Sequence, residues 1–181
     1  YSFLPSRKGN SISDTVGKHI LKWTDKNFVE YKWTDRGSDE RQYCAPHIDL
    51  PIASIMRTKH GCYEEYHTSL DDLINVVTPQ GLEGGYNALL RAVETLEKNL
   101  TPVVKVCGEP QLGKRGLYPN LSTKKFDSEV RLMMDLITWS DGTNTLLDIA
   151  EICEVPIWDL YPILDKLVEN DLIELKENKK M

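Results

Sequence analysis

His67 lies in the part of the sequence that is richest in side chains able to do chemistry, residues 61–72. Tyr66 precedes it, and Thr68 and Asp71 follow it just before a segment of helical pattern. This pattern predicts a neutral imidazole at a rigid strand-to-helix corner, where it could bind zinc while Asp71 fixes the ring. Zinc needs three or four ligands, so a single histidine is not a site. In the alternative, His67 is a buried strand-end residue and Asp71 only caps the next helix.

A second polar segment, residues 37–44, lies upstream. Asp39 and Glu40 could bind a metal or act as a general base, and Arg41 could hold a carboxylate through two parallel hydrogen bonds. In the alternative, the segment is a charged turn in contact with solvent. Because both polar segments flank short apolar stretches that we interpret as strands, we expect them to form one rim of an active site.

A third segment, residues 108–118, places glycines around Lys114 and Arg115. Such glycines could form an anion-binding nest of backbone N–H groups. The segment lacks the spacing and the Ser or Thr of a P-loop. The alternative is a structural clasp against the sheet.

Helical and strand patterns alternate along the first 124 residues. A serine cap at Ser11 or Ser13 predicts a helix to about residue 23, and Thr78 with Pro79 predicts another to about residue 100. Residues 1–10 read as a polar entry loop. Short alternating or β-branched stretches predict strands at residues 28–33, 50–56 and 102–106. This order predicts an α/β sandwich.

Residues 125–181 show the order of a winged helix-turn-helix, three helical patterns followed by a strand. They carry six basic and 13 acidic side chains, a net charge of −7. The third helix exposes Asp159, Asp165 and Glu169, where a DNA-reading helix would present Arg, Lys, Asn or Gln. We therefore expect protein contacts or domain capping from this unit, and not DNA binding.

The composition is that of a globular chain of 181 residues with a net charge of −6. No apolar run approaches the roughly 20 residues that cross a bilayer, and no signal peptide is visible. The four cysteines are scattered without a CxxC pair, which favours reduced thiols in a cytoplasm. Because the chain starts at Tyr1, we expect residues to be missing before it.

Five ordered motifs together resemble the aminopeptidase-like family of bacterial proteins of unknown function, which is similar to zinc aminopeptidases. They cover nearly the whole chain, and members of this kind end in a winged helix. The motifs are residues 4–10 (LPSRKGN), 37–44 (GSDERQYC), 50–58 (LPIASIMRT), 65–73 (EYHTSLDDL) and 109–118 (EPQLGKRGLY).

The resemblance implies a three-layer α/β/α fold and a site with one or two zinc ions, in which a metal-bound water attacks a carbonyl. His67 would be the last metal ligand and Asp71 its supporting carboxylate. Asp39 to Tyr43 (Asp39, Glu40, Arg41, Gln42 and Tyr43) would contact a small-molecule or peptide-like substrate, although Glu40 stands where those enzymes have a histidine. Their other ligands, a histidine, an aspartate and a glutamate, and the general base lie in an N-terminal half outside this chain. We therefore expect the 181 residues alone to bind zinc poorly and to hydrolyse nothing.

The sequence thus predicts the C-terminal part of an aminopeptidase-like domain at residues 1–124 and a winged helix at residues 125–181. The rival interpretation is a non-catalytic module, a degenerate hydrolase half with an acidic winged helix that binds proteins. Both interpretations are compatible with a homo-oligomer, and neither involves a membrane.

Overall fold

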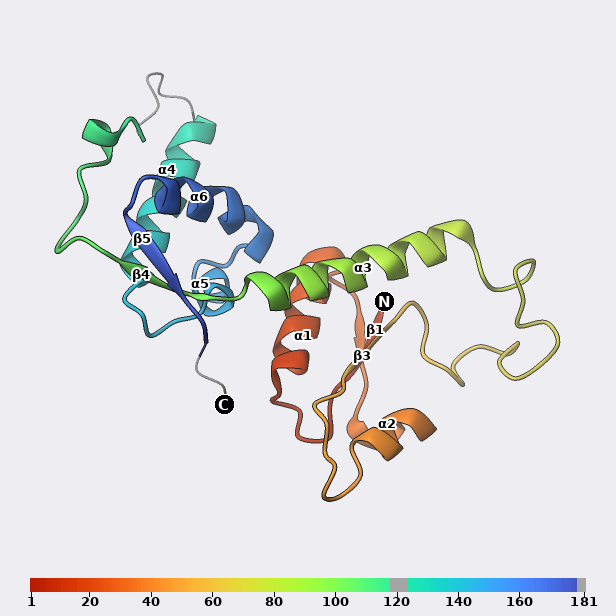
Figure 1. Cartoon of the computed structure of the whole chain (residues 1–181). Coiled ribbons are helices and arrows are strands. Elements are labelled where there is room, and N and C mark those ends of the chain that lie inside the picture. The colour runs from red at the N-terminus through yellow and green to blue at the C-terminus, as the bar shows by residue number, and fades with distance from the viewer. Residues whose placement is uncertain (118–123, 179–181) are drawn as a thin grey trace. The chain divides into compact units, whose positions relative to one another are not determined.

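The chain is a mixed α/β protein whose computed structural model describes residues 1–117 and 124–178 (Figure 1). It divides into two compact units, Tyr1–Leu96 and Glu97–Met181. Each unit has a small sheet of its own. Within the described residues, no helix is both long enough and apolar enough to cross a membrane.

The sheet of the first unit has the strand order β2-β1-β3. β1 (Ser2–Leu4) pairs in parallel with β2 (Val29–Glu30) and antiparallel with β3 (Ser54–Met56). The prediction of a polar entry loop at residues 1–10 was therefore wrong, because its first residues form the central strand. Phe3 and Leu4 have no exposed surface, but three residues are too few to show a strand period.

Helix α1 (Ile12–Thr24) begins at Ser11, as the serine cap predicts. Its apolar face is buried. The helix approaches β1 closely, because a Cβ added to Gly17 would lie 2.5 Å from Cε2 of Phe3. Only glycine permits this distance between the helix and the strand.

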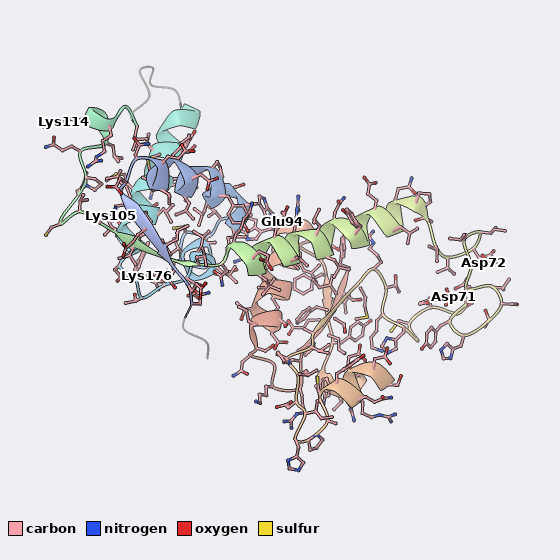
Figure 2. The ribbon with its side chains drawn as sticks, viewed as in Figure 1. Asp71, Asp72, Glu94, Lys105, Lys114 and Lys176 are labelled. Carbon is pink, nitrogen blue, oxygen red and sulfur yellow. The ribbon has the colours of Figure 1, made fainter. Side chains whose placement is uncertain are left out.

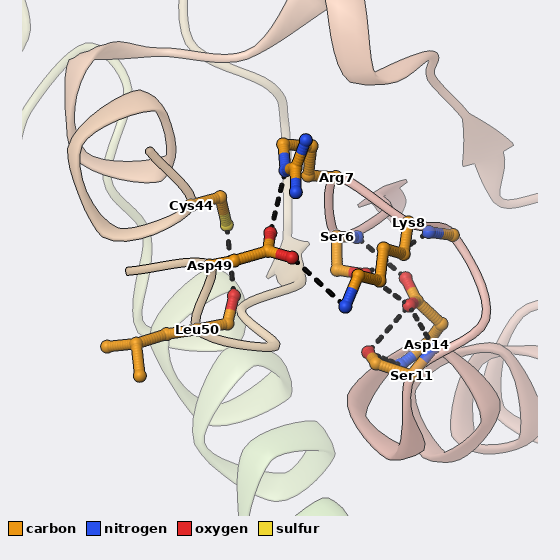
Figure 3. A network of polar contacts seen from close by, with 9 residues as sticks. Ser6, Arg7, Lys8, Ser11, Asp14, Cys44, Asp49 and Leu50 are labelled. Carbon is orange, nitrogen blue, oxygen red and sulfur yellow. Dashed lines mark hydrogen bonds and ion pairs between the residues drawn. The ribbon is translucent and has the colours of Figure 1, made fainter. Parts of the chain in front are cut away.

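The segment between β1 and α1 is held by the buried carboxylate of Asp14 (Figure 3). Asp14 Oδ1 accepts a hydrogen bond from Ser6 N at 2.7 Å, and Oδ2 accepts from Ser6 Oγ at 2.5 Å. Oδ2 also accepts from Ser11 N at 2.8 Å and Ser11 Oγ at 2.6 Å. Burial acts to raise the pKa of Asp14, but these hydrogen bonds outweigh it and lower the pKa below its ordinary value.

Arg7 and Lys8, which follow Ser6 in the motif at residues 4–10, bind this segment to the connection between α2 (Ser38–Tyr43) and β3 (Figure 3). Arg7 Nε lies 2.7 Å from Asp49 Oδ1, and Lys8 Nζ lies 3.1 Å from Asp49 Oδ2. Hydrogen bonds to Arg7 and Lys8 hold the pKa of Asp49 well below its usual range. Cys44 Sγ donates to the carbonyl of Leu50 at 3.2 Å in the same connection. The motif at residues 4–10 is therefore a structural clamp in this fold.

Helix α3 (Pro79–Lys98) follows the predicted threonine and proline start. Its buried residues are Ala88 and Thr95. Its large apolar side chains are instead 42–65% exposed, namely Leu82, Tyr86, Leu89, Leu90, Val93 and Leu96.

The second unit has the winged helix-turn-helix order. It contains α4 (Lys124–Trp139), α5 (Leu146–Ile152) and α6 (Ile157–Glu169), with a core of leucines and isoleucines. β4 (Thr101–Val104) pairs antiparallel with β5 (Ile173–Lys176) to form the wing; Lys176 ends β5, and Lys105 directly follows β4 (Figure 2). The strand that we assigned to the N-terminal sandwich at residues 102–106 thus belongs to the winged unit. Its β-branched pattern predicts a strand but carries no information about the partner strand.

The glycine-rich segment before α4 packs against the winged unit. A 3₁₀ turn (Leu112–Arg115) ends at Gly116, which has a left-handed φ of 68°. Leu112 is buried, and Arg115 Nη1 donates to the carbonyl of Asn170 at 3.0 Å. This arrangement is that of a structural clasp. Tyr118, the last residue of the segment, lies outside the described residues.

Candidate functional site

His67 lies on an irregular loop between β3 and α3, in which residues 57–78 form turns and bends. The predicted strand-to-helix corner is therefore wrong, because β3 ends at Met56 and α3 begins only at Pro79. His67 has a left-handed φ of 62° and is exposed, so it is not a buried strand-end residue. Its ring stacks on Tyr66, with centroids 4.0 Å apart and planes inclined by 19°.

Aromatic contacts continue from Tyr66 into the rest of the loop. Tyr63 packs edge-on against Tyr66, with ring centroids 5.7 Å apart. The rings of His60 and Tyr66 have centroids 6.0 Å apart and planes inclined by 40°. Stacking of this kind restricts the orientation of each ring. The loop thus presents His67 at the end of a row of packed rings.

Asp71, the predicted partner of His67, is engaged elsewhere. Its Oδ2 accepts a hydrogen bond from the Tyr63 hydroxyl at 3.0 Å, and burial together with this carboxylate raises the pKa of Tyr63. Asp71 does not cap a helix. Its neighbour Asp72 instead accepts from the backbone N–H groups of Ile74 and Asn75, each at 2.8 Å (Figure 2).

The second polar segment is a helix, α2 (Ser38–Tyr43), and not the predicted turn. Glu40 is the third residue of α2, and its carboxylate caps the start of the helix. Glu40 Oε2 accepts from Gly37 N at 2.9 Å, and Oε1 accepts from Ser54 Oγ of β3 at 2.9 Å. Burial acts to raise the pKa of Glu40, but these bonds and the nearby His60 lower it.

The other candidate residues of α2 are open to solvent. Asp39, Arg41, Gln42 and Tyr43 are all exposed. Tyr43 retains 52% of its accessible surface, although it precedes the buried Cys44. These four side chains can therefore reach a ligand, whereas both oxygens of Glu40 accept hydrogen bonds within the unit.

His60 brings the two polar segments together. A Cβ on Gly37 would lie 3.1 Å from His60 Nε2 and 3.0 Å from Glu40 Oε2, so the imidazole sits against the start of α2. His60 also neighbours Tyr66, which carries the stacked His67. His60 was not predicted as a site residue, because its spacing from the other histidines does not resemble that of metal ligands. In the sequence, the glycine that follows His60 is the local sign of a turn. In the structure, this Gly61 has a left-handed φ of 75°.

A metal site needs more ligands than these residues supply. Across residues 1–117 and 124–178, no three His, Cys, Asp or Glu side chains converge as a metal ion requires. His67 and Asp71 therefore do not form a zinc site by themselves, and the donors present do not fit a complete one.

Sequence comparisons define the class of both units. Residues 100–175 match the family described as winged helix-turn-helix, so the second unit is a domain of that class. Residues 1–99 match the family described as Domain of unknown function (DUF4910), to which this chain belongs.

Two relatives come from Clostridium acetobutylicum. A protein named "Putative polysaccharide biosynthesis protein with aminopeptidase-like domain" is 36% identical over 146 residues, which cover 78% of this chain and 33% of that protein. A crystal structure described as that of a "putative peptidase" superposes with a TM-score of 0.82 at 30% identity, covering 97% of this chain and 38% of the other. The chain thus spans 33% and 38% of the lengths of these two relatives. These relatives confirm the resemblance to the aminopeptidase-like family of unknown function.

Proposed function

We propose that this chain is the C-terminal part of a zinc-dependent, aminopeptidase-like hydrolase that cleaves amide or peptide bonds. The observation that carries the proposal is the superposition of 97% of the chain, at 30% identity, on a chain described as a "putative peptidase". The name of the other relative, which includes the words "aminopeptidase-like domain", supports the same activity. In this proposal, the small sheet of the first unit is one part of a three-layer α/β/α domain that is completed by further chain.

The proposal gives His67 the role of one zinc ligand, with the remaining ligands and the general base outside these 181 residues. Its support is the exposure of the imidazole and the stacking on Tyr66, which limits the positions that the ring can take. Such restraint lowers the entropy lost when a ligand binds a metal. Asp71 would then act on the site only through the hydroxyl of Tyr63.

Substrate contacts are proposed for the exposed residues of α2. Asp39 and Arg41 supply charge of both signs, and Gln42 and Tyr43 supply neutral hydrogen-bonding groups. A peptide-like substrate carries both an amine and carboxyl groups, which these side chains can bind. Glu40 is a positioning residue in this proposal, since it ties α2 to β3 through Ser54.

The test is the zinc content of the longer protein that carries this chain, measured by elemental analysis before any metal is added. We expect about one or two ions per chain, and loss of zinc and of peptide hydrolysis in His67→Ala. His47→Ala is the matched control, because His47 is also exposed and has a left-handed φ of 71°. Full zinc and activity in His67→Ala would refute the role of His67.

A second measurement separates this proposal from its rival. The 181-residue chain alone should take up no zinc on titration, because its described residues provide no group of three ligands. If the longer protein also lacks zinc and takes up none, the chain is a non-catalytic scaffold, and its interactions define its function.

A further inference from the structure

A groove of about 890 Å³ opens in the winged unit between α4 and the first half of α6. Apolar side chains from the α5–α6 turn and from α6 contribute to its lining, namely Val155, Trp158, Pro162 and Ile163. Its volume lies within the roughly 300–1,000 Å³ of cavities that enclose small ligands, so it can hold several side chains of a peptide.

The charged lining of the groove is mostly acidic. It comprises Glu129, Asp135 and Asp159 against one basic residue, Arg131. Glu129 Oε1 lies 2.5 Å from the amine of Lys166, which compensates that carboxylate. Within the part of the chain that the structure describes, neither Asp135 nor Asp159 forms an ion pair. Even with Arg131 in its lining, the groove therefore keeps a net negative charge for a partner to neutralise.

The lining also contains an uncharged cysteine. Cys153 lies in the groove at the end of α5, and its burial, with a further effect of the nearby Asp135, raises the pKa of its thiol. The thiol is therefore protonated at neutral pH and behaves as a small apolar group. The groove thus combines an apolar floor with negative charge.

We infer that this groove is a docking site for a basic segment of a partner protein that inserts an apolar anchor. The lysine or arginine side chains of that segment would lie near Asp135 and Asp159, and its anchor would contact Trp158 and Pro162. Complementary charge sets the preference between partners, while burial of the apolar anchor supplies much of the affinity.

The same charges disfavour other ligands. Nucleic acids and anionic membranes present phosphate groups, which carboxylates repel, and affinity for duplexes depends on basic side chains. An acidic or purely apolar peptide would leave the two carboxylates without counter-charges next to a desolvating surface.

The test uses the whole chain and two labelled synthetic peptides of 14 residues, one built from Lys and Leu at helical spacing and one with each Lys replaced by Glu. Two-dimensional ¹H–¹⁵N spectra would follow the indole signals during titration, and fluorescence anisotropy would give the affinity. We expect the Lys–Leu peptide to shift the indole signal of Trp158, which lines the groove, and to leave that of Trp139 in place. The Glu–Leu peptide and a short DNA duplex should shift neither signal.

Asp159→Lys and Asp165→Lys form a matched pair, because both aspartates are exposed on α6 and only Asp159 lines the groove. Each substitution changes the net charge by the same amount, so non-specific attraction falls equally in both. We expect Asp159→Lys to weaken binding about tenfold and Asp165→Lys by less than about twofold. Equal weakening in the two variants, an unmoved Trp158 signal, or equal binding of the acidic peptide or the duplex would overturn the inference. Because both positions are solvent-exposed, unchanged circular dichroism is expected and would show that each variant is folded.

Discussion

Replacing Asp14 with asparagine tests whether one buried carboxylate holds the start of the first unit together. Asn and Asp have nearly the same shape, so the substitution removes charge and one acceptor without opening a cavity. Asp14 retains only 2% of its accessible surface and accepts four hydrogen bonds from Ser6 and Ser11. In the variant, the amide NH₂ must face either the N–H of Ser6 or the three donors at the other oxygen, which are Ser6 Oγ, Ser11 N and Ser11 Oγ.

The magnitude follows from those contacts. A buried donor that loses its partner costs about 1–3 kcal/mol, and bonds to a charged acceptor are roughly twice as strong as neutral ones. One lost partner and the weakening of the remaining bonds together give a destabilisation of about 3 kcal/mol, which is a roughly 150-fold change in an equilibrium constant. Such a loss is a large fraction of the stability of a small domain.

Hydrogen exchange measured by mass spectrometry would localise the effect. Amides of α1 should exchange roughly 150-fold faster in Asp14→Asn at pH 7. Asp148→Asn is the control, since Asp148 makes the same capping contacts with Thr145 at the start of α5 but is exposed. That control should leave the exchange of α1 unchanged.

The pH dependence has a defined sign. The folded pKa of Asp14 lies below its unfolded value of 3.8, so the carboxylate contributes its full stability above that pH. The contribution is lost as the pH falls through the folded pKa, and the ratio of exchange rates between variant and wild type should shrink below about pH 3.8. A ratio under about fivefold at pH 7, or one that does not change with pH, would refute the assignment of this carboxylate as the organising group.

Two glycine substitutions test the close approaches in the first unit. Gly17→Ala should destabilise it by about 1 kcal/mol in urea unfolding, because a clash with the buried Phe3 outweighs the roughly 1 kcal/mol gained in helix propensity; a stabilised variant would contradict this contact. Gly37→Ala should displace the ring of His60 and change its NMR signals, at a cost of under about 1 kcal/mol, whereas unaltered His60 signals would show that the imidazole does not lie against α2.

The helices were predictable because their signals are local. Ser11 and Thr145 each begin a helix with an aspartate three residues later, and both capping boxes form in the structure. Pro79 likewise stands at the first position of α3. Apolar residues at helical spacing then marked the extent of α1 and α3, so their bounds differ from the predictions by only a few residues. The six residues of α2 are too few for such a pattern, and a turn was predicted there.

The strands were harder to predict because they are short and their pairing is distant in sequence. β1 has three residues, fewer than a period-2 pattern needs to be recognised, and the strands predicted at residues 28–33 and 50–56 form only over Val29–Glu30 and Ser54–Met56. The pairing of β4 with β5 joins segments about 70 residues apart, and no local pattern identifies such a partner.

The two polar segments that the sequence brings forward stand before and after β3 in the chain, and their role in a site stays a prediction. The left-handed backbone of His67 cannot be read from residue types. The contact that joins the segments runs through His60 and Gly37, which lie 23 positions apart. The sequence does not distinguish Gly37, which leaves room for the ring of His60, from any other glycine that precedes a helix.

Glu40 serves the fold at the position where the resemblance to zinc aminopeptidases implies a histidine. The resemblance aligns it with a histidine beside the metal, yet here it accepts hydrogen bonds from both Gly37 and Ser54. A neutral imidazole offers one acceptor nitrogen, so histidine could not satisfy both donors. The carboxylate of Glu40 therefore links α2 to β3. The imidazole that lies against the start of α2 is that of His60, and residue 40 supplies none. Any function that needs an imidazole near the start of α2 would consequently have to use His60 or His67.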